Sequence, residues 1–286
     1  MNGIARSASA ELFRLRKWSA VWVIVGVWAA LTLAFGYVFD FVAYSTGADS
    51  FASSGVPREA LLGGLLPQGL ADGFVQGMPM FGGALAMVLG ALVAGNGFAW
   101  GTWKTAFVQG PSRLAATAGS LAALVVIVVG IVAVSVVVAA AASLGVAAAE
   151  NQAVVWPAAT DLAESVGAGI AVLGMWALIG YALGLVTRSP ALGVGLGLVW
   201  SLVVENLLRA VGAMLSGIET ATLLLPGTAA GSVVGAVTGA TSAADGASAP
   251  GVLTSLTGDR ALVTVLVYAL AAATVSLVVG ARRDVA

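Results

Sequence analysis

Six long apolar stretches, separated by shorter polar segments, dominate the pattern of hydrophobic and polar positions along the chain. Each stretch is long enough to cross about 30 Å of hydrocarbon as a helix, which takes about 20 residues at a rise of 1.5 Å per residue. The pattern therefore predicts an all-α polytopic membrane protein in which residues 1–286 form a single transmembrane domain. The six predicted spans are residues 18–39, 78–98, 121–146, 167–186, 190–208 and 261–281.

Composition narrows the class of protein. Of the 286 residues, 60% are hydrophobic and 9% are charged, whereas a soluble globular domain carries about 25% charged residues. No sizeable water-exposed domain is therefore expected, and a net charge of −1 argues against nucleic acid as a partner. The chain has no Cys and no His, which removes thiol nucleophiles, disulfides, imidazole bases and most zinc and haem chemistry. We expect no catalytic residue, no metal site and no cofactor in this chain.

The loops between the predicted spans alternate between rich and poor in basic residues. With the N-terminus inside, nine of the twelve cations fall on the inner side, so the positive-inside rule predicts that both termini are cytoplasmic. The nine inner cations are Arg6, Arg14, Arg16, Lys17, Lys104, Arg113, Arg188, Arg282 and Arg283. The three outer cations are Arg58, Arg209 and Arg260.

Residues 1–17 form a predicted amphipathic helix ahead of the first span. At 100° per residue, the apolar Ile4, Ala8, Leu12 and Leu15 share one side of this helix, and the basic residues face the other way. Such a helix lies in the plane of the membrane interface, with its cations toward anionic headgroups. The alternative is that these cations only set the topology.

The two long outer loops are expected to differ. Residues 40–77 are rich in Gly, Ser and Ala, and they predict short helices that rest on the membrane. Residues 209–260 contain an apolar stretch, 210–237, that Glu219, Pro226 and several glycines interrupt. We therefore expect a broken, partly embedded outer hairpin between spans five and six rather than a seventh span.

The inner loop, residues 99–117, carries an aromatic pattern. Trp100, Trp103 and Phe107 are spaced three and four apart, which places them on one face of a short helix beside Lys104. The sequence Gly110-Pro111 ends that helix, and Ser112 is able to cap the next one. Trp and Phe are favoured anchors at protein interfaces, so this face invites a partner. The alternative is an interfacial aromatic belt without any partner.

Glu205 is the one strong charge well inside a predicted span, about 22 Å along a helix of about 30 Å. A carboxylate there should face a partner or a cavity, because exposure to hydrocarbon costs on the order of a few kcal/mol. Arg209 lies one turn later and offers an internal ion pair. Alternatively, Glu205 forms part of an outward-facing substrate path together with Trp200 and Asn206.

Small residues recur at four-residue spacing in three of the predicted spans. Such spacing lets helices approach closely in a membrane, where lipid provides no hydrophobic force between them. The span over residues 78–98 carries the longest stripe, which consists of Gly82, Ala86, Gly90 and Ala94. Shorter repeats are Gly180 with Gly184, and Gly193 with Gly197.

The arrangement resembles the permease subunit of a bacterial ATP-binding cassette (ABC) transporter of the type-2 exporter superfamily. The resemblance covers nearly the whole chain, from the basic amphipathic helix through six spans with both ends inside. It rests on the inner-loop runs Gly101-Thr102-Trp103-Lys104-Thr105 and Gly110-Pro111-Ser112-Arg113. The end of the fourth span, Gly184-Leu185-Val186-Thr187-Arg188-Ser189, and the outer hairpin around Pro226 fit the same family.

The resemblance implies a division of labour between polypeptides. It implies that two permease halves, identical or homologous, assemble in the bacterial cytoplasmic membrane with two cytosolic ABC ATPase subunits, which hold the ATP and Mg. The inner loop then forms a coupling helix that docks on the ATPase, so that Trp100, Trp103, Lys104 and Phe107 become partner-contact residues. The chain itself supplies no nucleotide site, because neither of its lysines, Lys17 and Lys104, follows a glycine-rich phosphate loop.

The cargo expected from the apolar spans is a hydrophobic or amphipathic small molecule, as in drug or antibiotic efflux. Two other classes of protein compete with this interpretation. A secondary transporter or channel acting alone is disfavoured by the shortage of ionisable groups inside the spans. A membrane scaffold that transports nothing is the third class.

Overall fold

The computed structural model describes residues 2–47, 56–108, 112–212, 214–240 and 249–282, and every element within them is a helix, as the sequence predicts. Of the short elements, η1, η3 and η4 are π-helical and η2 is a 3₁₀ turn. In chain order, the elements are α1 (Asn2–Lys17), α2 (Ser19–Leu33), η1 (Ala34–Val38), α3 (Phe39–Thr46), α4 (Arg58–Leu65), η2 (Pro67–Gly69), α5 (Leu70–Gly73), η3 (Met78–Gly82), α6 (Gly83–Ala99), α7 (Thr102–Val108), α8 (Arg113–Ala149), α9 (Ala159–Thr187), α10 (Pro190–Leu198), η4 (Val199–Val204), α11 (Glu205–Gly212), α12 (Ser216–Thr222), α13 (Pro226–Val237) and α14 (Gly258–Arg282).

Six helical stretches in the described part of the chain are long and apolar enough to cross a membrane, so the chain is a multi-pass membrane protein. They coincide in order and position with the six predicted spans. The stretches are Ser19–Thr46, Met78–Ala99, Arg113–Ala149, Ala159–Thr187, Pro190–Gly212 and Gly258–Arg282. The third begins earlier than predicted because the Ser112 side chain caps α8, accepting the Ala115 backbone N–H at 3.2 Å.

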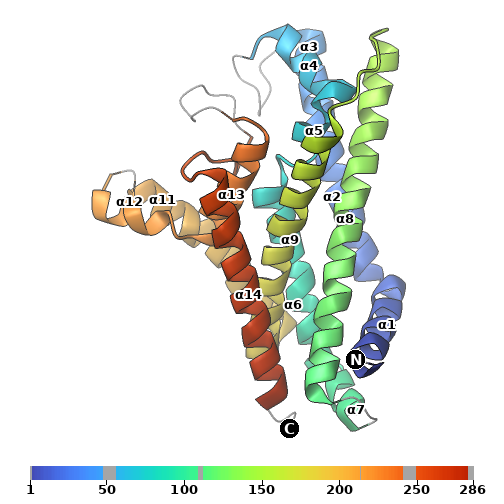
Figure 1. Cartoon of the computed structure of the whole chain (residues 1–286), viewed down its shortest axis with the longest axis vertical. Helices are drawn as coiled ribbons and strands as arrows, with labels where there is room; N and C mark the ends of the chain where they lie inside the picture. Colours follow the sequence, from blue (N-terminus) through green and yellow to red (C-terminus); the bar gives the residue numbers. More distant parts are fainter. Residues whose placement is uncertain (1, 48–55, 109–111, 213, 241–248, 283–286) are drawn as a thin grey trace.

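The centre of the bundle is the close pair α6 and α9 (Figure 1). A side-chain Cβ on Gly90 would overlap the carbonyl oxygen of Ala177, and one on Gly180 would overlap that of Met87. Glycine at these two positions therefore lets the helix backbones touch, as expected for small residues in a membrane. Within the predicted stripe, Gly82, Ala86, Gly90 and Ala94 are all buried.

A tight turn connects α9 to α10 and places α10 against the same centre. Arg188 adopts a left-handed backbone (φ 53°), and the Ser189 side chain caps α10 by accepting the Leu192 N–H at 3.3 Å. Pro190 then starts the helix at a position where its missing N–H has no cost. A Cβ on Gly193 would lie 2.9 Å from the Gly184 Cα, so α10 also approaches α9 closely.

Helix α1 packs along the start of α8 rather than resting on lipid alone (Figure 1). Leu15 is fully buried, and the Ser120 hydroxyl of α8 donates a hydrogen bond of 3.2 Å to the Glu11 carboxylate. Arg14 pairs with the same carboxylate. The face of α1 opposite these contacts is exposed, including Phe13 at 66%. Residues 2–17 therefore form a helix as predicted, but this helix is attached to the bundle.

The expectation that residues 40–77 only rest on the membrane is wrong. Leu65, Leu70, Phe74 and Val75 are at most 2% exposed and belong to the hydrophobic core. The segment packs against α8 and α9 because its apolar residues cluster around the α4, η2 and α5 turns and form one buried face.

The connection between α11 and α14 has an exposed part and a buried part. In Figure 1, α11 and α12 project sideways from the bundle, whereas α13 lies against α14. Ala229, Ala230 and Val234 of α13 are fully buried. The Leu253 N–H donates a hydrogen bond of 3.1 Å to the Gly231 carbonyl, so the irregular segment before α14 packs on α13.

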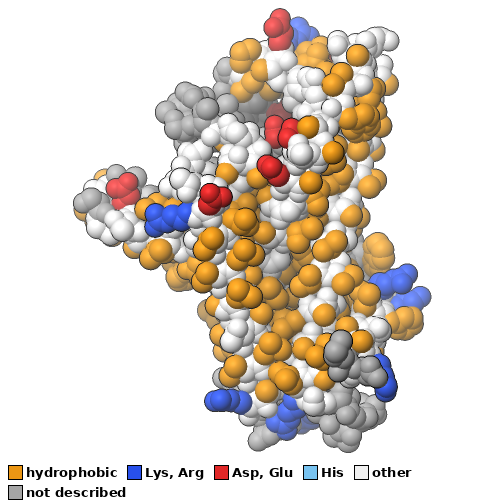
Figure 2. Space-filling view, viewed as in Figure 1, with side chains coloured by type: hydrophobic (Ala, Val, Ile, Leu, Met, Phe, Trp, Pro, Cys, Tyr) orange, Lys and Arg blue, Asp and Glu red, His pale blue; other side chains and the backbone are white. Residues whose placement is uncertain are grey.

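Charged side chains separate toward the two ends of the bundle (Figure 2). The end that carries α1, α7 and the last turn of α14 is basic, and it also holds both chain ends (Figure 1). The opposite end is acidic. The described acidic residues of α3 to α5 and of the region around the α8–α9 connection lie there, and they are Asp40, Glu59, Asp72, Glu150, Asp161 and Glu164.

Candidate functional site

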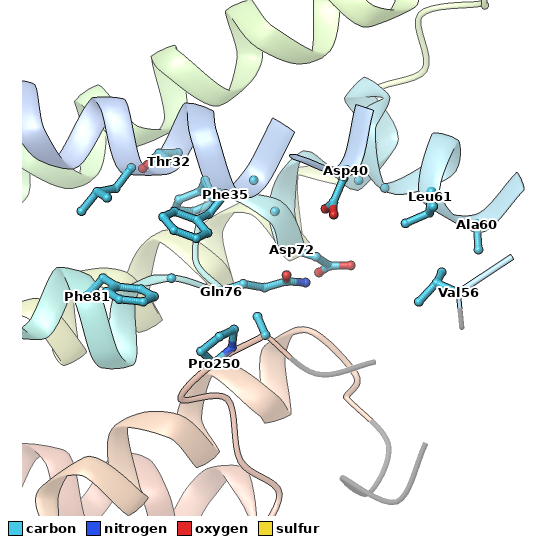
Figure 3. A pocket seen from close by; sticks show the side chains of 18 of the residues that line it. Thr32, Phe35, Asp40, Val56, Ala60, Leu61, Asp72, Gln76, Phe81 and Pro250 are labelled. Atoms are coloured by element: carbon cyan, nitrogen blue, oxygen red, sulfur yellow. The ribbon is translucent and has the colours of Figure 1, made fainter. Parts of the chain in front are cut away.

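A cavity of about 250 Å³ lies within the chain at the acidic end of the bundle (Figure 3). Its walls come from α2 and η1 on one side, from the α4–α5 segment on another, and from η3 on a third. Pro250, which precedes α14, closes it from below in the view of Figure 3, and Ala249 also lines it. The cavity is smaller than a drug-sized pocket, which is about 300 Å³ or more, and it suits a compact ligand.

One half of the cavity is aromatic. The rings of Phe35 and Phe81 stack with centroids 5.6 Å apart and planes inclined by 17°, so they join η1 to η3 across the wall. Trp28 contributes a third ring, and its indole N–H is occupied by a hydrogen bond of 2.7 Å to the Ser135 hydroxyl of α8. Three aromatic side chains therefore line this half of the cavity.

The other half of the cavity is acidic. Asp40, Asp72 and Gln76 line this half and extend their polar groups into the space between the helices (Figure 3). Burial raises the pKa of the Asp72 carboxyl, and the nearby Asp161 carboxylate raises it further. The described lining contains no Lys or Arg side chain. Arg58, at the start of α4, lies over the Tyr44 ring at 4.8 Å.

Two of the three π-helical segments form walls of this cavity. Phe35 and Gly36 belong to η1, and Phe81 belongs to η3. A π-helical turn inserts an extra residue into a helix, which displaces side chains from their regular positions and is frequent at functional sites. Here η1 lies within the first spanning stretch and η3 forms the first turn of the second, and the stacked Phe35 and Phe81 rings join them where the cavity lies.

The residues predicted to form either an ion pair or a substrate path come together around Glu205. Its carboxylate is fully buried, accepts the Trp200 indole N–H at 3.0 Å and the Gly227 backbone N–H at 2.8 Å, and lies 3.6 Å from an Arg209 guanidinium nitrogen. The Arg209 guanidinium also donates to the Asn206 amide oxygen at 2.9 Å. The expected Glu205–Arg209 ion pair is therefore present, and it ties α11 to the start of α13.

Little space remains beside the Glu205 cluster. The neighbouring cavity is about 30 Å³, the volume of about one water molecule, and it is lined by Met80, Asn206, Arg209 and Gly227 among others. Trp200 is 44% exposed on the outside of the bundle. The residues of this cluster thus hold one another, and the cavity beside them has no room for a cargo molecule.

The four inner-loop residues take different positions, and the expectation that Trp103 contacts a partner needs correction. Trp103 is 8% exposed, and its indole N–H donates to the Ala94 carbonyl at 3.1 Å. A Cβ on Gly97 would overlap the indole, so this glycine makes room for the ring. Trp103 thus anchors α7 to the end of α6.

The other inner-loop residues are further from the core. Trp100 is 57% exposed, and its ring lies at a steep angle to that of Trp18, with the ring centroids 5.7 Å apart. Lys104 is exposed. Phe107 belongs to α7, but its side chain lies outside the described part of the chain, as do Gly110, Pro111 and Arg283.

No group of three or more Asp and Glu side chains in the described residues is arranged to hold a metal ion.

Neither the scan of protein-family models nor the search of curated proteins finds a match for this chain. The function is therefore inferred from the geometry of the chain itself.

Proposed function

We propose that the chain is the membrane-spanning permease subunit of an ATP-driven exporter, working with two cytosolic ABC ATPase subunits and a second permease half. The observation that carries the proposal is the position and attachment of α7. This short helix lies at the basic end of the bundle, between two spanning helices, and is attached to the first of them by a buried side chain. Its exposed side is available to a partner, whereas its inner side is fixed.

The attachment of α7 supports a mechanical role. Trp103 bonds to Ala94 in α6, and the Thr102 hydroxyl donates to the Gly97 carbonyl at 3.3 Å. A force applied to α7 would therefore reach α6 directly, and α9 through the close glycine contacts with α6. Movement of a rigid α6–α9 pair is the kind of rigid-body change that alternating access requires.

Charge separation supports the proposed orientation. Eight described cations lie at the end with α1 and α7, and the described residues 56–77 and 147–165 at the opposite end contribute only Arg58. By the positive-inside rule, we expect the basic end, with both termini and α7, to face the cytoplasm, the side on which an ATPase would bind. The acidic end then faces outward from the bacterial cytoplasmic membrane.

The test is purification of the tagged full-length chain from membranes of its own host. We expect an ABC ATPase subunit in a one-to-one ratio with the permease. Lys104→Glu should remove most of this ATPase, because it reverses the exposed charge on α7. Arg282→Glu, an equal reversal at the same end but on α14, serves as the matched control and should retain the ATPase.

Reconstituted vesicles provide the decisive measurement. Cargo accumulation should require ATP and the ATPase, and it should cease in Lys104→Glu. Accumulation of cargo by the purified chain alone, driven by an ion gradient, would overturn the proposal in favour of a secondary transporter.

A further inference from the structure

We propose that the cavity between α2–η1, α4–α5 and η3 binds a compact organic cation with an aromatic or apolar body. As an assignment of cargo class, this inference rests on the proposed export function. As a binding site, it belongs to this chain alone and can be tested without any ATPase.

The aromatic half of the cavity supplies recognition of the ligand body. Phe35, Phe81 and Trp28 present rings on adjoining walls, and ring faces attract cations as well as aromatic groups through their quadrupole. Because the Trp28 N–H is already bonded to Ser135, this ring has no unpaired donor that would favour an anion.

The acidic half supplies selection by charge. Asp40 and Asp72 line the same cavity, and Asp161 lies near enough to raise the pKa of Asp72. A carboxylate whose ionised form is opposed by a neighbouring carboxylate, as that of Asp72 is by Asp161, gains stability when a cation comes beside it. A ligand with a positive group at one end and a ring at the other therefore matches both halves at once, whereas an anion would face repulsion.

The backbone supplies the space. Several glycines line the cavity, among them Gly36, Gly64, Gly73 and Gly77. A Cβ on Gly36 would meet only the Gly73 carbonyl oxygen, at 3.9 Å, and one on Gly64 would meet nothing within 4 Å. Space is therefore left at positions where a larger side chain would otherwise fill it.

The experiment uses the purified full-length chain in lipid nanodiscs. The probe is the fluorescent cation dimethylaminostyryl-N-methylpyridinium, whose emission rises in apolar surroundings, with empty nanodiscs as background. Its unmethylated pyridine analogue, neutral at alkaline pH, has almost the same shape. We expect saturable binding of the cation and binding of the neutral analogue weaker by about tenfold, as for one lost charge interaction in a partly solvated site.

Three variants locate the binding. The double variant Asp40→Asn, Asp72→Asn should weaken cation binding by about tenfold and leave the neutral analogue unchanged. The matched control Glu59→Gln, Glu164→Gln removes two exposed carboxylates from the same end, outside the cavity lining, and should bind as the unaltered chain does. Gly36→Leu should fill the cavity and abolish binding of both probes. Circular dichroism establishes that each variant is folded.

The proposal is overturned if the Asp40, Asp72 double variant binds the cation as tightly as the unaltered chain, or if the control variant is weakened equally. Its failure is distinguishable from that of the export function. Cation binding without ATP-dependent transport would support the binding site but contradict the export function. Transport that persists unchanged in the double variant and in Gly36→Leu would support the export function but contradict the binding site.

Discussion

Glu205 and Asp72 are both carboxylates close to a π-helical segment, but their surroundings are opposite. Glu205 is fully buried, and an indole N–H, a backbone N–H and a guanidinium surround it. Asp72 is exposed to the cavity at the acidic end, and another carboxylate lies near it. A buried charge with its partners inside the chain fixes a structure, whereas a carboxylate such as Asp72, at a cavity and beside another carboxylate, is suited to a partner from outside.

The largest test of this comparison is Arg209→Ala. Removing the guanidinium leaves the buried Glu205 carboxylate without its counter-ion, which we expect to lower the free energy of unfolding by about 3–5 kcal/mol. Thermal unfolding of the purified chain, followed by Trp fluorescence, would show it. Arg260→Ala, at an exposed arginine near the start of α14, is the control. An unchanged midpoint for Arg209→Ala would mean that the Glu205 cluster has no structural role.

Gly227→Ala tests the same cluster from the other helix. Its Cβ would overlap the Glu205 carboxylate and disturb the hydrogen bond from the Gly227 N–H. We expect a loss of about 1–3 kcal/mol, because the side chain of Glu205 must shift in a closely packed region. Gly217→Ala, where a Cβ would meet nothing within 4 Å, provides a control that should unfold at the original temperature.

Trp28→Phe tests the aromatic half of the cavity. The substitution keeps a ring but removes the donor to Ser135, so we expect a loss of about 0.5–1.5 kcal/mol. Binding of the cationic dye should persist, because Phe still presents a ring face. Trp22→Phe also removes an indole hydrogen bond, to the Arg16 carbonyl at 2.8 Å, but from a side chain that is 61% exposed, so it should cost less. Equal losses for the two variants would show that burial adds nothing to the contribution of the Trp28 side chain.

Asp72→Asn is the smallest and the most distinctive change. The pKa of Asp72 is raised in the folded chain, so the ionised carboxylate opposes folding. This penalty on the free energy of folding grows as the pH rises from the pKa of the unfolded chain, 3.8, through the pKa of the folded chain. The variant should therefore be slightly more stable at neutral pH, by less than about 0.5 kcal/mol because the side chain is exposed, and equally stable in acid. A loss of stability at neutral pH would contradict the repulsion inferred between Asp72 and Asp161.

The spanning helices could be predicted from the sequence because each follows from one local property, a long apolar run. Local rules also account for the caps at Ser112 and Ser189 and for the Glu205–Arg209 pair one helical turn apart. These features depend on residues at most four positions apart, where spacing alone fixes the geometry.

The cavity could not be predicted, because its walls come from segments far apart in sequence. Phe35 and Phe81 are stacked, and no local pattern pairs them. The π-helical turns that shape the walls have no simple sequence signal. A cue was present in Asp40 and Asp72, two acids flanking an outer loop rich in glycine, but their convergence depends on how residues 56–77 pack into the core.

The burial of Trp103 also could not be predicted from the residues next to it in the sequence. A three-four aromatic spacing predicts a shared helix face, but it does not say whether that face turns inward or outward. Gly97, five residues before Thr102, decides the question by leaving room for the indole. In the same way, α1 lies on α8 because Gly119 admits its backbone, since a Cβ there would be 2.8 Å from the Ala8 nitrogen.

The length of α8 has a consequence for communication along the normal to the bilayer. Its 37 residues rise about 55 Å, far more than the hydrocarbon thickness of about 30 Å. Near its start it holds Glu11 of α1 through Ser120, and just past its end Glu150 accepts a hydrogen bond of 2.9 Å from the Tyr44 hydroxyl. One uninterrupted helix is thus long enough to extend beyond the hydrocarbon at both ends. A small tilt of α8 at its first turn would displace its last turn by several ångströms.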